Sequence, residues 1–145
     1  MRYYEDLVPG ERYESGTHTV EEADLLEFAR KYDPQYFHVD PQEAKRSLFG
    51  GLIASGVYTM AIWRRLDHEI AHDIAWICGI RWDDVRFDVP VRAGDTLRAH
   101  AEILSKRLSE KRPERGVVIT EYILRNQRDE AVFSCTSVNL VERRT

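Results

Sequence analysis

The chain has 145 residues, of which 43% are hydrophobic and 32% are charged, and its formal net charge is −4 at pH 7. This length and composition are typical of one soluble globular domain, which we expect over residues 1–145, and the negative charge argues against nucleic-acid binding as the main activity. No apolar run reaches the roughly 18 residues of a membrane helix and no export signal is visible at the N-terminus, so we expect a cytoplasmic protein without a membrane partner.

The first predicted element is a helix that ends at about Tyr32. Thr19 and Glu22 have the spacing of a capping box, and apolar residues follow them at helical intervals. The dipeptide Asp33-Pro34 then disfavours further helix, because a proline restricts the backbone of the residue before it. We therefore expect the helix to stop at this point.

Two further helices are predicted after this stop. Asp40-Pro41 is typical of a helix start, with Asp40 as the N-cap and proline in the first helical position. Segment 33–40 is then a short loop between two helix ends. A longer helix follows, which we expect to be central and largely buried. Its apolar residues recur at helical spacing: Val57, Met60, Ala61, Ile62, Trp63, Leu66 and Ile70.

The rest of the chain alternates in polarity with period two, which predicts strands. The expected strands and the turns between them are Ile74–Val91, Thr96–Leu104, a charged hairpin at Ser109–Gly116, Val117–Asn126, a turn at Gln127–Glu130, and Ala131–Val141. The residues expected to share one sheet face are Val118, Thr120, Tyr122 and Leu124. Because helices precede strands, the predicted class is α+β, with a mainly antiparallel sheet wrapped on the long helix.

Two features of the strand region have ordinary interpretations. Cys78 and Cys135 lie in separate apolar segments, so we interpret both as small core residues in a reducing compartment. A basic run near the hairpin is interpreted as a solvated tip, with contact to the phosphates of a ligand as the alternative. Its members are Lys106, Arg107, Lys111, Arg112 and Arg115.

The first candidate site lies in segment 33–40. Asp33 and His38 are five positions apart there, beside Tyr36 and Phe37. A carboxylate and an imidazole can hold one water between them, the carboxylate taking its proton while the imidazole gives or takes another. We expect the neighbouring aromatic rings to keep Asp33 basic enough for this task. The alternative is a capping Asp33 and a structural His38.

The second candidate site is the glycine-rich segment Phe49–Gly56, which opens the long helix. Gly51 and Gly56 would let a substrate approach bare backbone N–H groups, where the helix dipole favours a developing negative oxygen. Ser55 is either part of this substrate site or a plain N-cap, and the glycines alternatively serve tight packing against the sheet. Together the two candidates offer an acid/base pair and an oxyanion site. Those are the two parts needed to add water to a double bond conjugated to a carbonyl.

A third motif, His68-Glu69-Ile70-Ala71-His72, matches the H-E-x-x-H pattern of zinc peptidases. We expect no metal there, because the surrounding helix end is polar and the next histidine, His100, lies in a predicted strand. Charged residues and histidines are common at solvent-exposed helix C-termini, where the helix dipole favours cations. The zinc peptidase is therefore kept only as a rival hypothesis.

With these residues in view, the chain resembles the MaoC-like dehydratases, a family of hotdog proteins that includes the R-specific enoyl-CoA hydratases. The resemblance runs from about Tyr4 to Val141. Three segments carry it, in the same order as in the family: Asp33-Pro-Gln-Tyr-Phe-His38-Val-Asp40, Phe49-Gly-Gly-Leu-Ile-Ala-Ser-Gly56, and Arg81-Trp82 followed by Pro90-Val-Arg-Ala-Gly-Asp-Thr-Leu97.

This resemblance implies a hotdog fold, a homodimer or larger homo-oligomer with active sites near the subunit interface, and an acyl-CoA thioester as substrate. It implies that Asp33 and His38 activate a water and that the N–H of Gly56 receives the thioester oxygen, without a metal or redox cofactor. Ser55 stands where many members have histidine, and no serine follows it in the long helix. The alternatives are a hotdog thioesterase and a non-catalytic protein that binds acyl thioesters.

Overall fold

The computed structural model describes residues 1–144. In chain order, the elements within that range are the 3-10 helix η1 (Tyr4–Asp6), β1 (Arg12–Thr19), α1 (Glu22–Tyr32), α2 (Tyr36–Val39), α3 (Pro41–Ala44), α4 (Gly56–Ile70), β2 (Trp76–Arg86), β3 (Thr96–Leu108), β4 (Arg115–Arg125) and β5 (Ala131–Glu142). None of the helices in this part of the chain is both long and apolar enough to cross a membrane.

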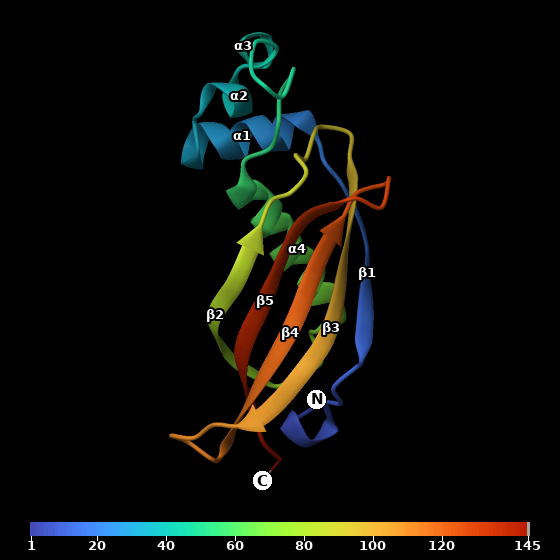
Figure 1. Cartoon of the computed structure of the whole chain (residues 1–145), viewed down its shortest axis with the longest axis vertical. Coiled ribbons are helices and arrows are strands. Elements are labelled where there is room, and N and C mark those ends of the chain that lie inside the picture. The colour runs from blue at the N-terminus through green and yellow to red at the C-terminus, as the bar shows by residue number, and fades with distance from the viewer. Residues whose placement is uncertain (145) are drawn as a thin grey trace.

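The strands form one antiparallel sheet in the order β1-β3-β4-β5-β2, and α4 runs along one of its faces (Figure 1). The short helices α2 and α3 lie with α1 beside the N-terminal end of α4. The β3–β4 hairpin and η1 lie at the opposite end of the sheet. A long helix wrapped by an antiparallel sheet is the hotdog arrangement, so the predicted α+β class and fold are confirmed.

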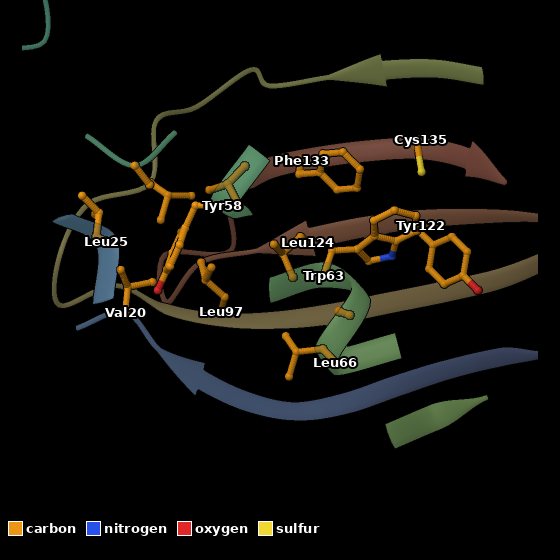
Figure 2. Packing of buried hydrophobic residues seen from close by; sticks show 14 of the residues in the cluster. Val20, Leu25, Tyr58, Trp63, Leu66, Leu97, Tyr122, Leu124, Phe133 and Cys135 are labelled. Carbon is orange, nitrogen blue, oxygen red and sulfur yellow. The ribbon is translucent and has the colours of Figure 1, made fainter. Parts of the chain in front are cut away.

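The core lies between α4 and the sheet, with Trp63 at its centre. Trp63 is fully buried, and its ring centroid lies 5.0 Å from that of Phe133 and 5.1 Å from that of Tyr122 (Figure 2). The residues predicted to share one sheet face are all buried: Val118, Thr120, Tyr122 and Leu124. Each large apolar side chain buried here stabilises the fold by about 1.5–3 kcal/mol. These contacts hold α4 against the sheet.

The N-terminal strand β1 was not predicted from the sequence. Most of its residues are partly or fully exposed, and a bulge between Glu14 and Thr17 interrupts its pairing with β3, so its polarity does not alternate cleanly. Thr19 is the last residue of this strand, and α1 begins at Glu22 without a side-chain cap. The capping-box prediction is therefore wrong, whereas the end of α1 at Tyr32 is as predicted.

The segment between α1 and α4 is more helical than predicted. Segment 33–40 is not all loop, because α2 forms one helical turn within it. The start of α3 is as predicted: the Asp40 side chain accepts hydrogen bonds from the N–H groups of Gln42 and Glu43, and Pro41 occupies the first position.

The four predicted strands are all present, with shifted ends. β2 stops at Arg86 instead of Val91, and β3 continues to Leu108. Cys78 is exposed on β2, so its assignment to the core is wrong. Cys135 is buried, and burial raises the pKa of its thiol to about 12, which keeps it protonated and unreactive at neutral pH.

The two edges of the sheet differ in character. The β1 edge carries charged side chains, for example Arg12 and Glu14, which are typical of a solvated edge. The β2 edge pairs only with β5 and exposes large apolar side chains: Ile77, Ile80, Trp82 and Val85. An open edge with an apolar surface favours contact with another chain.

Candidate active site

The end of α1, the short helix α2 and the start of α4 meet at one end of the sheet. Asp33 directly follows α1, and its N–H donates to the carbonyl oxygen of Ala29 at 2.8 Å. The chain then turns into α2, where His38 is buried with its Nδ1 2.8 Å from the carbonyl oxygen of Ile53. Because a carbonyl oxygen only accepts, Nδ1 carries a proton, and in the neutral form of the ring Nε2 is then an acceptor.

The structure brings Asp33 and His38 together, with Ser55 as a third member. Oδ2 of Asp33 lies 3.7 Å from Nε2 of His38, and it accepts a hydrogen bond of 2.6 Å from the Ser55 hydroxyl. Gln35 donates to the other carboxylate oxygen at 3.2 Å. A gap of 3.7 Å is too long for a direct hydrogen bond. Since hydrogen bonds to water are about 2.8 Å long, one water beside the gap can contact both groups.

This environment lowers the pKa of the Asp33 carboxyl group. The largest cause is the hydrogen bond from Ser55, which outweighs the opposing effect of burial. The aromatic rings lie elsewhere: Phe37 packs edge-on against His38, with ring centroids 4.6 Å apart, and Tyr36 is half exposed. The expectation that aromatic rings keep Asp33 basic is therefore wrong. Asp33 is ionised at neutral pH, and a hydrogen-bond donor keeps it so.

Gly56 is the first residue of α4, and little space is left for a side chain beside it. A Cβ atom at this position would lie 3.1 Å from the ring of Phe87. Phe87 itself packs on the buried Phe133, with ring centroids 5.5 Å apart, which limits how far its ring can yield. Among residues 1–144, no hydrogen bond engages the Gly56 N–H, as expected in a first helical turn. This N–H is free to meet a ligand oxygen at the positive end of the helix dipole.

The other two residues predicted to bind substrate occupy different places. Ser55 is fully buried and is the N-cap of α4, since its hydroxyl accepts from the Val57 N–H at 3.2 Å while it donates to Asp33. Gly51 lies in the loop five residues before α4, where a Cβ atom would be 3.5 Å from Nη1 of Arg92. The structure therefore places Ser55 in the site and Gly51 away from the helix start.

Several residues that hold the site together, from the chain after β2, had no predicted role. The Arg92 guanidinium donates to the carbonyl oxygen of Phe49 at 2.7 Å, although the two residues are 43 positions apart, and the Ala54 N–H donates to the carbonyl oxygen of Val91 at 2.8 Å. Phe87 likewise reaches Gly56 from beyond β2. The only sequence signal was the segment from Pro90 to Leu97, which carries the family resemblance but reveals no contact by itself.

The opposite end of α4 carries the His68–His72 motif. Glu69 is engaged with β1, because its carboxylate accepts from the Gly16 N–H at 3.1 Å. Nδ1 of His72 lies 3.2 Å from the carbonyl oxygen of Glu69. Within the part of the chain that the structure describes, no group of three or more His, Cys, Asp or Glu side chains could hold a metal ion.

The basic run lies on the β3–β4 hairpin, at the other end of the sheet from α2 (Figure 1). Its first member, Lys106, donates to the carbonyl oxygen of Tyr4 at 2.8 Å, and its ammonium group lies 4.5 Å from the centre of the Tyr4 ring. This part of the run thus has a structural contact to η1. Within one chain, the hairpin is remote from Asp33.

The arrangement has the parts of a water-activating site. Asp33 supplies an ionised acceptor, His38 in its neutral form supplies an acceptor at Nε2, and the N–H of Gly56 supplies a free donor. A carboxylate and an imidazole can hold and deprotonate a water, and a helix N-terminus can stabilise a carbonyl oxygen that gains charge.

Comparison with known proteins gives consistent matches over most of the chain. The family model described as MaoC like domain matches residues 6–124. YdeM of Bacillus subtilis is 32% identical over 142 residues, which cover 96% of this chain and 98% of YdeM. The 3-hydroxyacyl-thioester dehydratase Z of Mycobacterium tuberculosis is 34% identical over 90 residues, 61% of this chain and 59% of that protein. The crystal structure of the MaoC-like dehydratase from Rhodospirillum rubrum is similar with a TM-score of 0.93 and 38% identity, covering 100% of this chain and 99% of that one.

Proposed function

The chain belongs to the MaoC-like domain family, and on this premise we propose that it is a hydro-lyase acting on acyl-CoA thioesters. It adds water across the 2,3 double bond of an enoyl thioester, or forms that bond by removing water from the 3-hydroxyacyl thioester. One observation carries the proposal. The Asp33–His38 pair, with a gap that one water can bridge, is tied through Ser55 to the helix start whose Gly56 N–H is free. The relative named a 3-hydroxyacyl-thioester dehydratase supports the same chemistry.

In hydration, Asp33 takes a proton from water as the water oxygen bonds to C3 of the substrate. The electrons of the double bond move toward the thioester, whose oxygen gains enolate charge beside the N–H of Gly56. The proton taken by Asp33 ends on C2. Nε2 of His38, 3.7 Å from Oδ2, is placed to orient the water and to relay this proton. Dehydration follows the same steps in reverse, and every group used belongs to the chain or to the CoA thioester.

The lowered pKa of Asp33 gives this mechanism a defined pH dependence. Asp33 is the proton acceptor, so the enzyme loses hydration activity as the pH falls through the pKa of Asp33. Because the Ser55 hydrogen bond holds this pKa below the ordinary value for aspartate, we expect the loss to occur in the acid range below that value. A rate profile from neutral to acid pH measures it.

The decisive experiment follows a panel of enoyl-CoA thioesters by two readouts at once. Loss of the absorbance of the conjugated double bond reports hydration, and release of free thiol reports hydrolysis of the thioester. We expect loss of absorbance without thiol. Thiol release with an intact double bond would instead show a hotdog thioesterase, and binding without either change would show a non-catalytic acyl-thioester-binding protein.

We propose in addition that the working unit is a homodimer or a larger homo-oligomer joined through the β2 edge. The support is the unpaired edge of β2 and its exposed apolar side chains. One surface hollow of the single chain lies between the C-terminal half of α4 and β2, and Trp82 is among the residues that line it. A second copy on β2, next to Phe87, would help to enclose the acyl group near Gly56.

This assembly is tested with one charge at the centre of the edge. Ile80 is 50% exposed, so Ile80→Lys should leave the single chain folded and separate the copies. Light scattering should give at least twice the chain mass for the wild type and a lower mass for this variant. Leu104→Lys is the matched control, because Leu104 is 44% exposed on β3, away from this edge. A wild-type protein that is monomeric and active would contradict the proposal.

A further inference from the structure

Ser55 is a buried hydroxyl whose two hydrogen bonds have fixed directions. The Val57 N–H can only donate, so the hydroxyl oxygen accepts there, at 3.2 Å. The single hydroxyl proton then points to Oδ2 of Asp33, at 2.6 Å. Ser55 has no solvent-exposed surface, so water does not compete for either bond.

The bond to Asp33 connects the halves of the site across 22 positions of sequence. The Asp33 oxygen that Ser55 holds is the same oxygen that faces Nε2 of His38 at 3.7 Å. Ser55 is also joined by one peptide bond to Gly56, where α4 begins. Any rotation of the Asp33 carboxylate away from His38 must therefore break the bond to Ser55, and a shift of the helix start would move Asp33 with it.

We propose that Ser55 is a positioning residue that holds the Asp33 carboxylate, ionised and in one orientation, at a fixed place relative to the Gly56 N–H. The catalytic part of this inference rests on the hydratase proposal. Ser55 does not need to touch the substrate: it acts through Asp33. Its assignment thus differs from the substrate-binding role expected from the sequence and from that of a plain N-cap.

Loss of the Ser55 hydroxyl should raise the pKa of Asp33. Ser55 is the largest cause that lowers the pKa of Asp33, followed on the same side by Gln35 and by His38, which is the ionisable neighbour. Without the Ser55 donor, partial burial opposes ionisation more effectively, so the pKa of Asp33 rises. The carboxylate also becomes free to rotate. The acid limb of kcat/KM should then move to higher pH, and kcat should fall while KM changes little.

Two variants separate this role from helix capping. Ser55→Gly removes the donor but keeps an acceptable N-cap residue, which costs the helix only a few tenths of a kcal/mol. Ser55→Thr keeps a hydroxyl, and the backbone angles of Ser55, φ −58° and ψ 140°, suit both residues. Two readouts are taken on each full-length variant: the pKa of Asp33 from carboxyl ¹³C NMR, and the pH profile of enoyl-thioester hydration. Thermal unfolding confirms that each variant is folded.

We expect Ser55→Gly to raise the pKa of Asp33 and to lower kcat about tenfold, since hydrogen bonds to charged groups are among the stronger ones. Ser55→Thr should bring both values back toward those of the wild type. An unchanged pKa of Asp33 in folded Ser55→Gly protein would overturn the inference, whatever Ser55→Thr does. A raised pKa in a protein that hydrates none of the thioesters would keep the role of Ser55 and remove the proposed function instead.

Discussion

Residues that could bind a ligand or act as acids and bases lie near both ends of α4, but they make different contacts in the folded chain. At the N-terminal end, Asp33 and His38 lie within reach of one water and the N–H of Gly56 is free. At the C-terminal end, Glu69 holds β1 and His72 contacts the helix's own backbone. Each motif is compact in sequence, so spacing alone does not separate them. What separates them is whether their hydrogen-bonding capacity is already used by the fold.

The difference follows from what lies against each end. The N-terminal end meets the end of α1, and the segment that follows α1 delivers Asp33 and His38 to it from about 20 positions away in sequence. The C-terminal end meets β1, whose bulge exposes the Gly16 N–H and takes up the carboxylate of Glu69. Substitutions at three positions of each end test this comparison.

The largest effect is expected for the acid/base pair. Asp33→Asn keeps the size of the side chain and removes the proton acceptor, so hydration should fall at least about a hundredfold. His38→Ala should cause a similar loss. The double variant should be little worse than either single variant, because both residues act on one water. Steady-state rates with an accepted enoyl thioester measure all three.

Both variants are expected to fold, although for different reasons. Asp33 lies outside the apolar core, and Asn can still accept from Ser55, so thermal unfolding should change little. His38 is buried and bonded to Ile53, so its variant should lose some stability. Near-normal turnover by folded Asp33→Asn protein would remove Asp33 from the mechanism. The N-terminal end of α4 would then have no better claim to catalysis than the C-terminal end.

A second effect is expected at Gly56. Gly56→Ala places a methyl group 3.1 Å from the ring of Phe87, so this ring, which packs on Phe133, must shift slightly. We expect destabilisation by about 1 kcal/mol from this overpacking, together with lower hydration because Phe87 shifts beside the free N–H. Gly51→Ala is the control, since the nearest atom there is a flexible arginine end at 3.5 Å. Equal rates for both alanine variants would show that the Gly56 contact is unimportant.

A smaller effect is expected at the other end of the helix. Glu69→Gln weakens a charge-assisted bond to the Gly16 N–H, so the free energy of unfolding should fall by about 0.5 kcal/mol, with hydration unchanged. Chemical denaturation measures the first quantity and the standard assay the second. A large loss of activity without loss of stability would assign chemistry to this end of α4.

The smallest effect is expected for the two histidines. The pair of changes His68→Ala and His72→Ala should leave hydration unchanged, and so should treatment of the wild type with a chelator. The purified protein should contain no stoichiometric zinc. Zinc that is lost together with activity on chelation would overturn this expectation.

Periodicity predicted those parts of the fold whose burial repeats regularly. α4 and the strands β3, β4 and β5 bury every third or fourth, or every second, residue, and they appeared where expected. β1 was missed because its bulge interrupts the alternation, and Cys78 was misplaced because β2 forms an edge with almost no buried residue. An edge strand carries little information about which of its faces is covered.

The site was predictable only where its residues are neighbours in sequence. Asp33 and His38 share one short segment, as do Ser55 and Gly56, so local spacing marked both pairs. The pKa of Asp33 was predicted in the wrong direction because its main cause lies 22 positions away. Contacts between distant segments, which only the fold creates, were invisible to local patterning.

The contact between the loop before α4 and the chain around Arg92 should open locally, without unfolding of the whole protein. Two hydrogen bonds, from Arg92 to Phe49 and from Ala54 to Val91, fix that loop to the chain beyond β2, whereas the sheet is closed by long ladders of pairs. The loop is also bonded to α2 through Ile53 and to Asp33 through Ser55. Its contact with the chain beyond β2 is small, however, and should open more often than the whole protein unfolds. Amide hydrogen exchange at Ala54 should therefore be faster than at Leu124. On warming, activity should be lost at a lower temperature than that of the cooperative unfolding of the sheet.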